Sequence, residues 1–184
     1  MKIKVIKVGS LQTNCYIVID EASNQAIVID PGDEAVKIIP EINGLTVSSI
    51  VITHGHPDHF GALDEIKKIT GAKLLAHPAD HWFYKPERAL NDGDIISCGN
   101  INLTVIATPG HSQGGICLFT PGYLFSGDTL FYHTYGRTDL PSSSEEAMLT
   151  SLAKLARLPD ETIVYPGHDQ ATTIGAEKEF GTLG

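Results

Sequence analysis

Three histidines and an aspartate lie within six residues of one another in the segment Thr53-His54-Gly55-His56-Pro57-Asp58-His59. Neutral imidazoles and carboxylates are ligands that zinc, iron and manganese bind in proteins. The pattern H-x-H-x-D-H places four such groups on one short turn, so it predicts a metal site. The alternative interpretation is a polar loop whose histidines are incidental.

The elements on either side of this turn are suited to hold it in place. Residues 49–52 are apolar and rich in β-branched side chains, which predicts a buried strand. Residues 60–69 predict a helix that ends at Gly71. A turn between a strand and a helix can direct several side chains toward one point.

Three more candidate ligands follow other predicted strands. Residues 101–107 alternate in polarity and lead to His111, a hairpin over residues 115–119 and 123–125 leads to Asp128, and residues 162–165 lead to His168. Gly-Asp or Pro-Gly-His alone is typical of a turn. Because ligand chemistry follows four strands, we expect these side chains to meet at one edge of a rigid scaffold.

The remaining pattern predicts a mixture of short strands and helices. Further strands are expected at 3–8, 15–20, 26–30 and 73–76, and helices at 34–43, with Pro40 as a kink or early stop, 78–84 and 144–158. Serines 142–144 can cap the last helix, whose predicted apolar stripe is Met148, Leu149, Leu152, Leu155 and Ala156. The tail after Ala176 is expected to fray.

Composition narrows the class of protein. The 184 residues suit one domain, 1–184, and the net charge of −9 with 13 scattered Lys and Arg disfavours a nucleic-acid partner. No segment has the pattern of a signal peptide or the length of a membrane span, so no membrane partner is expected. Three widely separated cysteines predict buried free thiols and a cytoplasmic location, and no feature assigns an oligomeric state.

Together, six motifs resemble those of the metallo-β-lactamase-fold hydrolases, and within them the small glyoxalase II-like (hydroxyacylglutathione hydrolase-like) proteins. The matching segments are Ile29-Asp30-Pro31-Gly32, Thr53 to His59, Thr108-Pro109-Gly110-His111-Ser112, Phe125-Ser126-Gly127-Asp128-Thr129, Gly136-Arg137-Thr138-Asp139 and Tyr165-Pro166-Gly167-His168. The resemblance implies an α/β (α+β) fold, a four-layer αβ/βα sandwich of two mixed β-sheets with helices on the outside. Patterning alone indicates only α and β with mostly short strands.

The resemblance also implies how the ligands are shared between two divalent metal ions. The first metal site comprises His54, His56 and His111; the second comprises Asp58, His59 and His168; Asp128 bridges both. Asp30 resembles the family's carboxylate that supports a ligand without binding the metal. Zinc is the expected metal, with iron or manganese as alternatives.

The implied activity is hydrolysis of a small-molecule thioester such as S-lactoylglutathione. Two dications about 3.5–4 Å apart can ionise a shared water, and the resulting bridging hydroxide would attack the acyl carbon. One metal would hold the developing oxyanion, and Asp58 would act as a catalytic group by orienting the hydroxide. A thiolate leaves readily, so a general acid is not needed.

The chain departs from full-length glyoxalase II proteins in two ways. It ends at Gly184, so no C-terminal glutathione-binding helical domain is expected. The family's lysine and tyrosine contacts to glutathione are replaced by Tyr135-Gly136-Arg137-Thr138-Asp139. Arg137 is a candidate to bind a substrate carboxylate with Tyr135 beside it; the alternative is that Arg137 pairs with Asp139. We therefore expect a relaxed or different thiol portion.

Other functions share these residues. A persulfide dioxygenase would use one iron at the first metal site, and a lactonase or β-lactamase would use the same chemistry on another substrate. A regulatory metal-binding module is disfavoured because structural zinc sites are closed, and a nuclease is disfavoured by the acidic balance. The histidines outside motifs (His77, His81, His133) and the aromatic run Trp82, Phe83 and Tyr84 are expected to serve packing or surface roles.

Overall fold

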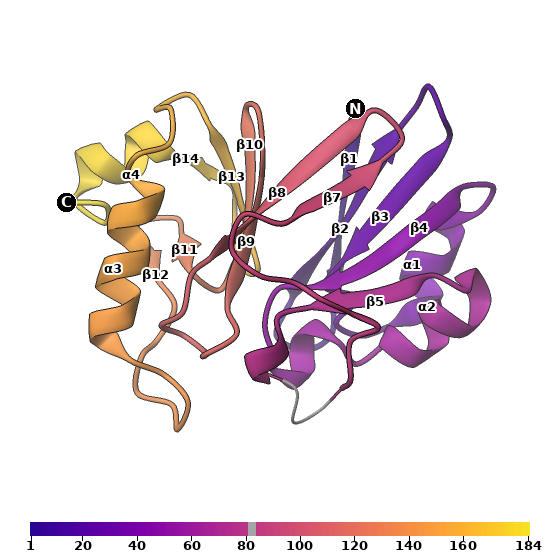
Figure 1. Ribbon diagram of the computed structural model, residues 1–184, viewed down its shortest axis with the longest axis horizontal. Coiled ribbons are helices and arrows are strands. Elements are labelled where there is room, and N and C mark those ends of the chain that lie inside the picture. Colours follow the sequence, from indigo (N-terminus) through magenta and orange to yellow (C-terminus); the bar gives the residue numbers. More distant parts are fainter. Residues whose placement is uncertain (81–83) are drawn as a thin grey trace.

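The computed structural model describes residues 1–80 and 84–184. Two six-stranded sheets pack face to face, and helices cover the two outer faces (Figure 1). The layers follow one another as helices, sheet, sheet and helices. The four-layer αβ/βα sandwich predicted from the motifs is therefore confirmed.

The first sheet joins an antiparallel half to a parallel half. Its strands, in order across the sheet, are β1 (Lys2–Val8), β2 (Thr13–Asp20), β3 (Gln25–Ile29), β4 (Thr46–Ile52), β5 (Lys73–Ala76) and β6 (Arg88–Ala89). Strands β3 to β6 run parallel, so each pair needs a crossover connection. Helices α1 (Ala35–Ile42) and α2 (Leu63–Thr70) form two of these crossovers.

The second sheet is antiparallel except between β10 and β13. Its strands, in order, are β14 (Thr172–Thr173), β13 (Ile163–Pro166), β10 (Tyr123–Gly127), β9 (Ile116–Thr120), β8 (Ile101–Ala107) and β7 (Ile95–Cys98). Helix α3 (Glu145–Leu155) crosses from β10 to β13, and α4 (Ile174–Phe180) follows β14. A small hairpin, β11 (Leu130–Phe131) and β12 (Thr134–Tyr135), precedes α3.

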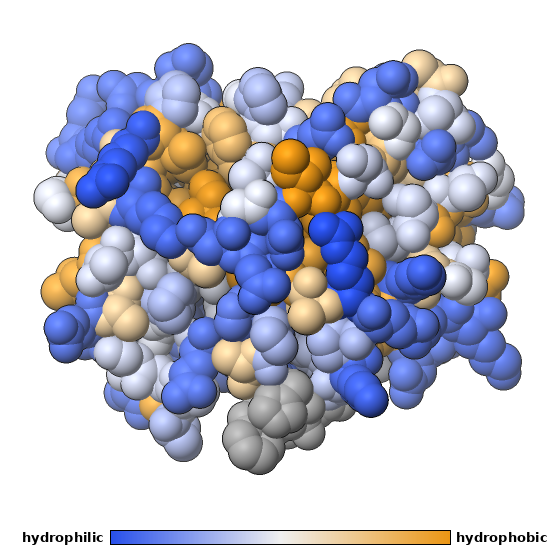
Figure 2. Space-filling model, viewed as in Figure 1, coloured by the Kyte–Doolittle hydropathy of each residue, from blue (hydrophilic) through white to orange (hydrophobic). Residues whose placement is uncertain are grey.

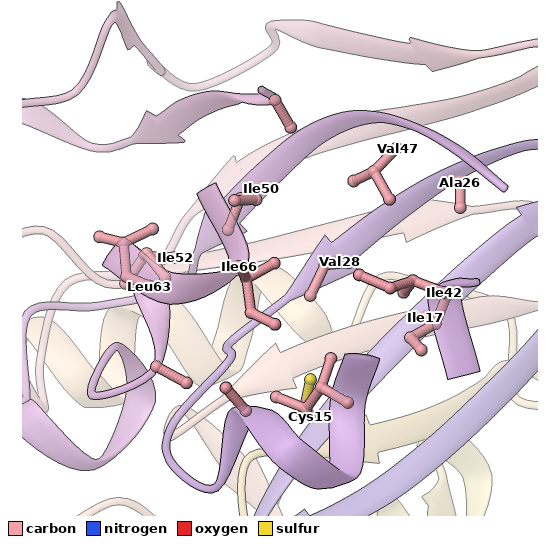
Figure 3. Close-up of a cluster of buried hydrophobic side chains, with 14 of the residues drawn as sticks. Cys15, Ile17, Ala26, Val28, Ile42, Val47, Ile50, Ile52, Leu63 and Ile66 are labelled. Carbon is pink, nitrogen blue, oxygen red and sulfur yellow. The ribbon is translucent and has the colours of Figure 1, made fainter. Parts of the chain in front are cut away.

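Strand β2 shows how one strand serves two cores. All eight of its residues are buried, because helices cover one face of its sheet and the second sheet covers the other. Ile17 belongs to the core beneath α1 and α2 (Figure 3), and so does Ile19. Tyr16 and Val18 belong to the core between the sheets. The two-residue period of a strand produces this division.

Helix α3 confirms the predicted capped helix with one change. The Ser144 side chain accepts a hydrogen bond from the Ala147 N–H at 3.3 Å, and two glutamates occupy the first turn. The helix buries Met148, Leu152 and Leu155. Leu149 is 54% exposed, so its assignment to the apolar stripe was wrong. It lies about 100° around the helix from Met148, outside the face that the buried residues define.

Two further expectations are corrected at the ends of elements. The tail after Ala176 does not fray, because Glu177 is fully buried and accepts hydrogen bonds from the Thr172 and Thr182 hydroxyls. Of the helix predicted at 78–84, the described residues show only a 3₁₀ turn, Pro78–Asp80, and 81–83 lie outside the described residues. Pro40 does not stop α1, which continues to Ile42.

The polarity of the surface and the burial of the cysteines agree with what the composition predicts. Figure 2 shows hydrophilic residues over much of one face, with hydrophobic residues scattered between them. None of the helices formed by the described residues has the length and apolar character needed to span a membrane. Cys15, Cys98 and Cys117 are free and buried, as predicted.

One edge of the sandwich collects the ends of four strands. Strands β4 and β8 end immediately before the segments that carry His54 and His111. Strands β10 and β13 are parallel neighbours, so Asp128 and His168 follow ends that lie side by side. The expectation that these strand ends converge is met across both sheets.

Candidate metal centre

The seven predicted ligands lie in one cluster at this edge. Their potential ligand atoms form three overlapping groups in which all atoms lie within 4.8 Å of one another. The groups are His54, His56 and His111; His54, His59 and Asp128; and Asp58, His59 and His168. The first and third groups coincide with the two metal sites that the motifs implied, and Asp128 adjoins both.

The 53–59 turn presents four of these side chains because of its backbone. The chain bends at residues 53–55 after β4, is extended at His56 and tightens into a 3₁₀ turn at Pro57–His59, with Pro57 at its start. The His59 N–H donates to the His56 carbonyl at 3.0 Å. The sharp change of direction places Asp58 and His59 on the opposite side of the cluster from His56.

Asp128 lies at the middle of the cluster. Its Oδ2 is 3.4 Å from His111 Nε2 and 3.5 Å from His168 Nε2, and its Oδ1 is 3.4 Å from His59 Nε2. The contacts are longer than ordinary hydrogen bonds. Two ligand atoms that each lie about 2.0–2.2 Å from a zinc ion are separated by about 3–3.5 Å. The spacing therefore suits shared cations better than direct pairing.

Several ligand atoms have no partner within the protein. Among the described residues, His59 Nε2, His111 Nε2 and Asp128 Oδ1 are buried without a hydrogen bond. Buried polar atoms are rarely left unpaired, because the loss of hydration is costly. Two cations, one beside His111 and one beside His59 with Asp128 between them, would satisfy these atoms, so the donor set fits divalent metals.

The other ring nitrogen is held by an acceptor in four of the five histidines of the cluster. The Nδ1–H groups of His54, His59, His111 and His168 donate to Thr53 Oγ1, Asp30 Oδ2, the Arg137 carbonyl and the Leu11 carbonyl, at 3.2, 2.9, 2.9 and 3.1 Å. Nε2 of each of these rings faces the cluster, where that of His54 lies 3.0 Å from His56 Nδ1 and that of His168 lies 3.1 Å from Asp58 Oδ2. Outer contacts of this kind fix the tautomer and orientation of metal-binding histidines.

Asp30 supports the cluster without joining it. Its carboxylate accepts hydrogen bonds from the Thr53 N–H and hydroxyl, both at 2.7 Å, and from His59. The residue has a φ of 50°, in the left-handed region that aspartate tolerates better than most residues. This conformation turns its side chain toward the 53–59 turn, in the supporting position that the motif implied.

The two groups of histidines differ in their affinity for protons. Burial, together with the charges of neighbouring histidines, lowers the pKa of His54 well below its usual value, and burial also lowers that of His56. Burial opposes the charged form of His59 as well, but Asp128 and Asp30 outweigh it and hold its pKa well above the usual value. Burial likewise opposes a charge on His168, but the hydrogen bond to Asp58 and the charge of Asp128 raise its pKa overall.

Arg137 and Tyr135 lie near the cluster but engage other groups. The Arg137 guanidinium donates two hydrogen bonds to Asp139, at 2.6 and 2.7 Å, and its side chain is 64% exposed. The Tyr135 hydroxyl donates to Glu145 at 2.8 Å. The structure thus shows the Arg137–Asp139 pair that was the alternative to a substrate contact, while the Arg137 carbonyl holds His111.

A pocket of about 260 Å³ opens beside the first metal site. Its lining residues are Gly55, His56, Ala79, Asp80, Ser112, Gln113, Pro141 and Ser142. Most of the lining surface is apolar, and no lysine or arginine belongs to this described lining. The pocket can hold an acyl or alkyl group next to the cluster.

The residues that were expected to have packing roles stay outside the cluster where they are described. His77 Nδ1 accepts a hydrogen bond from the Ala79 N–H, and the His133 ring lies 3.8 Å from that of Phe180. Tyr84 packs edge-on against Phe60, with ring centroids 5.3 Å apart. His81, Trp82 and Phe83 lie outside the described residues.

Some residues that hold the cluster were missed from the sequence. Thr53 precedes the first ligand and was not assigned a role, and Asp80 accepts hydrogen bonds from two of the ligand-bearing segments. Leu11 contributes only a carbonyl. A hydroxyl next to the H-x-H pattern was a usable signal for Thr53, whereas no local pattern pointed to Asp80 or Leu11.

Comparison with known proteins identifies the family. The family model described as the metallo-beta-lactamase superfamily matches residues 8–168. The chain belongs to the metallo-beta-lactamase superfamily. Among curated members, an Aquifex aeolicus protein is 36% identical over 98% of this chain and 95% of its own length. The hydroxyacylglutathione hydrolase GloC of Haemophilus influenzae is 33% identical, over 97% and 95%.

Solved structures of this superfamily share the fold closely. BLEG-1, a B3 metallo-beta-lactamase, superposes with a TM-score of 0.90 at 32% identity, covering 97% of each chain. ETHE1 from Myxococcus xanthus gives 0.88 at 31% identity, covering 98% of this chain and 83% of its own. TTHA1623, solved in a di-iron-bound form, gives 0.86 at 33% identity, covering 96% and 98%.

Proposed function

We propose that this protein is a binuclear metallohydrolase that cleaves a small-molecule thioester of the S-lactoylglutathione type. The observation that carries the proposal is the cluster of seven ligands around Asp128, with buried ligand atoms left unpaired. The hydroxyacylglutathione hydrolase activity named for GloC, at 33% identity, supports the choice of substrate class. The metals proposed are two divalent cations, zinc first, with iron or manganese as alternatives; the di-iron form of TTHA1623 supports iron.

Residues around these cations would have different roles in the reaction. When bound, two divalent metals would lower the pKa of a shared water and polarise the thioester carbonyl. Asp58 is held by a hydrogen bond from the Thr13 hydroxyl at 3.0 Å. Burial favours its neutral form, but contacts with His168 and His59 lower its pKa overall, so it is ionised and can orient the water. The pocket beside His56 would receive one arm of the substrate.

The thiol half of the substrate need not be glutathione. Glutathione carries two carboxylates, and the described lining of the pocket has no basic side chain to meet them. Arg137 and Tyr135 are the proposed contacts for a substrate carboxylate. The exposed pair of Arg137 with Asp139 is a weak competitor, since surface ion pairs contribute little. A substrate carboxylate would form an ion pair with the same exposed guanidinium, so its contribution to binding is also expected to be small.

A second candidate is a persulfide dioxygenase with one iron at the first metal site. The proton states favour considering it: His54 and His56 have lowered pKa values, whereas His59 and His168 have raised ones. A metal must displace protons to enter the second site, so single occupancy is chemically accessible. A lactonase or β-lactamase of the same fold remains a further candidate, which the similarity to BLEG-1 supports.

Metal analysis and a substrate panel test the proposal together. The protein would be purified with excess zinc, iron or manganese and assayed on S-lactoylglutathione, a coenzyme A thioester, an uncharged thioester, a lactone and a β-lactam. We expect two metals per chain and thioester hydrolysis that does not require glutathione. One iron per chain with oxygen uptake on glutathione persulfide would establish the second candidate instead. The proposed site of action is the cytoplasm, where the three free cysteines would stay reduced.

A further inference from the structure

Asp80 joins two segments that carry ligands of the first metal site. It ends the 3₁₀ turn after β5 and is buried. Its Oδ2 accepts hydrogen bonds from the Gly55 N–H at 2.8 Å and the Ser112 hydroxyl at 2.7 Å, and its Oδ1 accepts one from the Gly114 N–H at 2.9 Å. One carboxylate thus satisfies three donors from two loops.

These donors adjoin the ligands in sequence and come from different sheets. Gly55 lies between His54 and His56, after β4 of the first sheet, whereas Ser112 follows His111, after β8 of the second. The carboxylate therefore spans the sandwich at the edge where the metal cluster lies. The distance between the two loops sets the distance between the ligands they carry.

The backbone is shaped to bring both loops up to this side chain. A Cβ added at Gly55 would lie 2.8 Å from Asp80 Cβ, and one added at Gly114 would lie 2.6 Å from Asp80 Cγ. Real Cβ atoms do not approach other atoms so closely, so the two glycines permit the contacts. The fit indicates a specific clamp rather than an incidental polar contact.

The second metal site is held by other groups. Asp30 orients His59, the Thr13 hydroxyl holds Asp58, and the Leu11 carbonyl orients His168. None of the hydrogen bonds that the structure shows for Asp80 reaches the described segments that carry these ligands. The hydrogen bonds of Asp80 therefore reach only segments of the first site. Asp30 holds His59 directly and reaches the first site only through Thr53.

We propose that Asp80 is a positioning residue that sets the spacing of His54 and His56 relative to His111, so that its loss weakens the first metal site selectively. The inference rests on the proposed metal centre but not on the choice of substrate. In Asp80→Asn, one oxygen would be replaced by an amide that faces an N–H donor. At least one of the three hydrogen bonds would be lost while the shape of the side chain remains.

Asp20 supplies a matched control at the opposite edge. It ends β2, accepts hydrogen bonds from Asn100 N, Asn100 Nδ2 and Ser23 Oγ, and so joins the first sheet to the β7–β8 turn of the second. Thr13, at the other end of β2, contacts Asp58. Seven residues of extended strand place Asp20 about 23 Å from that end. Asp20→Asn therefore makes the same chemical change in a clamp that is remote from the ligands.

The experiment measures zinc affinity by chelator competition in variants that retain one site each. His168→Ala disables the second site and reports on the first, and His56→Ala does the reverse. Adding Asp80→Asn to the His168→Ala variant should lower zinc affinity about 10–100-fold, the usual effect of losing an outer support. Adding it to the His56→Ala variant should change affinity less than about twofold, well below that effect.

The controls separate positioning from general stability. Asp20→Asn should lower the melting temperature of the metal-free chain without changing zinc affinity in either background. Ser112→Ala, which removes one of the three hydrogen bonds, should reproduce a smaller loss at the first site; it also keeps the test available if Asp80→Asn does not fold. Equal losses at both sites, no loss at either, or an equal loss with Asp20→Asn would overturn the inference. Failure of the wild-type protein to bind two zinc ions would instead count against the proposed function.

Discussion

The two halves of the metal cluster are built from different chemistry. The first metal site presents three imidazoles, and the pKa values of His54 and His56 are lowered, so these rings are neutral and ready to bind a metal at pH 7. The second site combines a carboxylate with His59 and His168, whose pKa values are raised. In the metal-free protein, the second site therefore holds protons on its histidine rings, whereas His54 and His56 of the first site hold none.

This difference bears directly on the choice between the two candidate functions. A binuclear hydrolase needs both sites filled, whereas a one-iron enzyme needs only the first. His54 and His56 of the first site are neutral, and Asp80 clamps this site across the sheets. A metal must compete with protons at the second site, where Asp30 orients His59. Occupancy of the second site is therefore the property that separates the two functions, and the predictions for Asp128, Asp30 and pH concern it.

The largest effect is expected from Asp128→Ala, which removes the side chain that lies between the two halves. Its two oxygens lie 3.4–3.5 Å from ligand atoms of both sites. Both metals should bind far more weakly, beyond the about 10–100-fold loss caused by removing an outer support, and thioesterase activity should disappear. Elemental analysis after dialysis and a thioester assay measure the two losses.

His133→Asn is the control for this variant. His133 lies outside the cluster at a φ of 60°, which asparagine tolerates, so metal content and activity should stay at the wild-type level. Retention of one tightly bound metal in Asp128→Ala would show that the two halves are independent. Full turnover by metal-free Asp128→Ala protein would refute the metallohydrolase proposal.

The next largest effect is expected from Asp30→Asn. With its oxygen in the place of Oδ1, the asparagine can still accept from the Thr53 N–H. Its amide would then face both the Thr53 hydroxyl and the Nδ1–H of His59, which now donate to Oδ2 at 2.7 and 2.9 Å. His59 would lose both its orientation and the charge that raises its pKa. Zinc affinity should fall about 10–100-fold at the second site. It should fall less at the first, which Asp30 reaches only through Thr53 and His54. Zinc titrations of the His56→Ala and His168→Ala backgrounds would resolve the two sites, and a loss confined to the first would contradict the assignment of Asp30.

The fold could be predicted as far as local patterns determine it. Alternation over residues 101–107 identified β8, whose Ile101, Leu103 and Val105 are buried on one face. The sheet order could not be derived this way, because the pairing of β10 with β13 joins segments separated by a whole helix. The four-layer arrangement was predicted from the resemblance of the motifs to a known family, because periodicity does not indicate how sheets pack. The tail was predicted wrongly because the hydrogen bonds of buried Glu177 are tertiary contacts.

The ligands were easier to predict than their supports. A histidine or aspartate in a short motif can be recognised as a candidate metal ligand from its side-chain type, so all seven members of the cluster were named from the sequence. Asp80 lies 25 and 32 residues from the two segments it joins, in a stretch with no metal-binding motif. The carbonyls of Leu11 and Arg137 act through the backbone, where side-chain identity carries no information. Such supports become visible only when the chain is folded.

A smaller effect is expected from a change of one pH unit. Because the pKa of His59 lies well above 6.5, the ring carries a proton at pH 7 that zinc must release, and His168 contributes in the same direction. Each released proton makes affinity fall by about tenfold for each unit of decreasing pH, and the slope disappears above the folded pKa. Between pH 8 and 6 the second site should follow this slope, and the first should be flatter. Calorimetry in two buffers of different ionisation enthalpy counts the protons; equal counts at both sites would remove the distinction.

The smallest effect is expected outside both halves, at Arg137. Its guanidinium already donates two hydrogen bonds to Asp139 on an exposed surface, where an ion pair contributes about 0.2–1 kcal/mol. A substrate carboxylate must replace that pair, so its net gain is limited. Arg137→Ala should raise KM for S-lactoylglutathione at most about fivefold and leave kcat and the KM of an uncharged thioester unchanged.

Asp139→Asn tests the same competition from the other side. It removes the charge that occupies Arg137, so KM for the anionic thioester should fall while the uncharged thioester is unaffected. Metal content should match the wild type in both variants, because His111 is held by the Arg137 carbonyl, which neither substitution removes. An equal change in KM for charged and uncharged thioesters would mean that this loop acts on the first metal site through its backbone. It would then make no contact with the thiol half of the substrate.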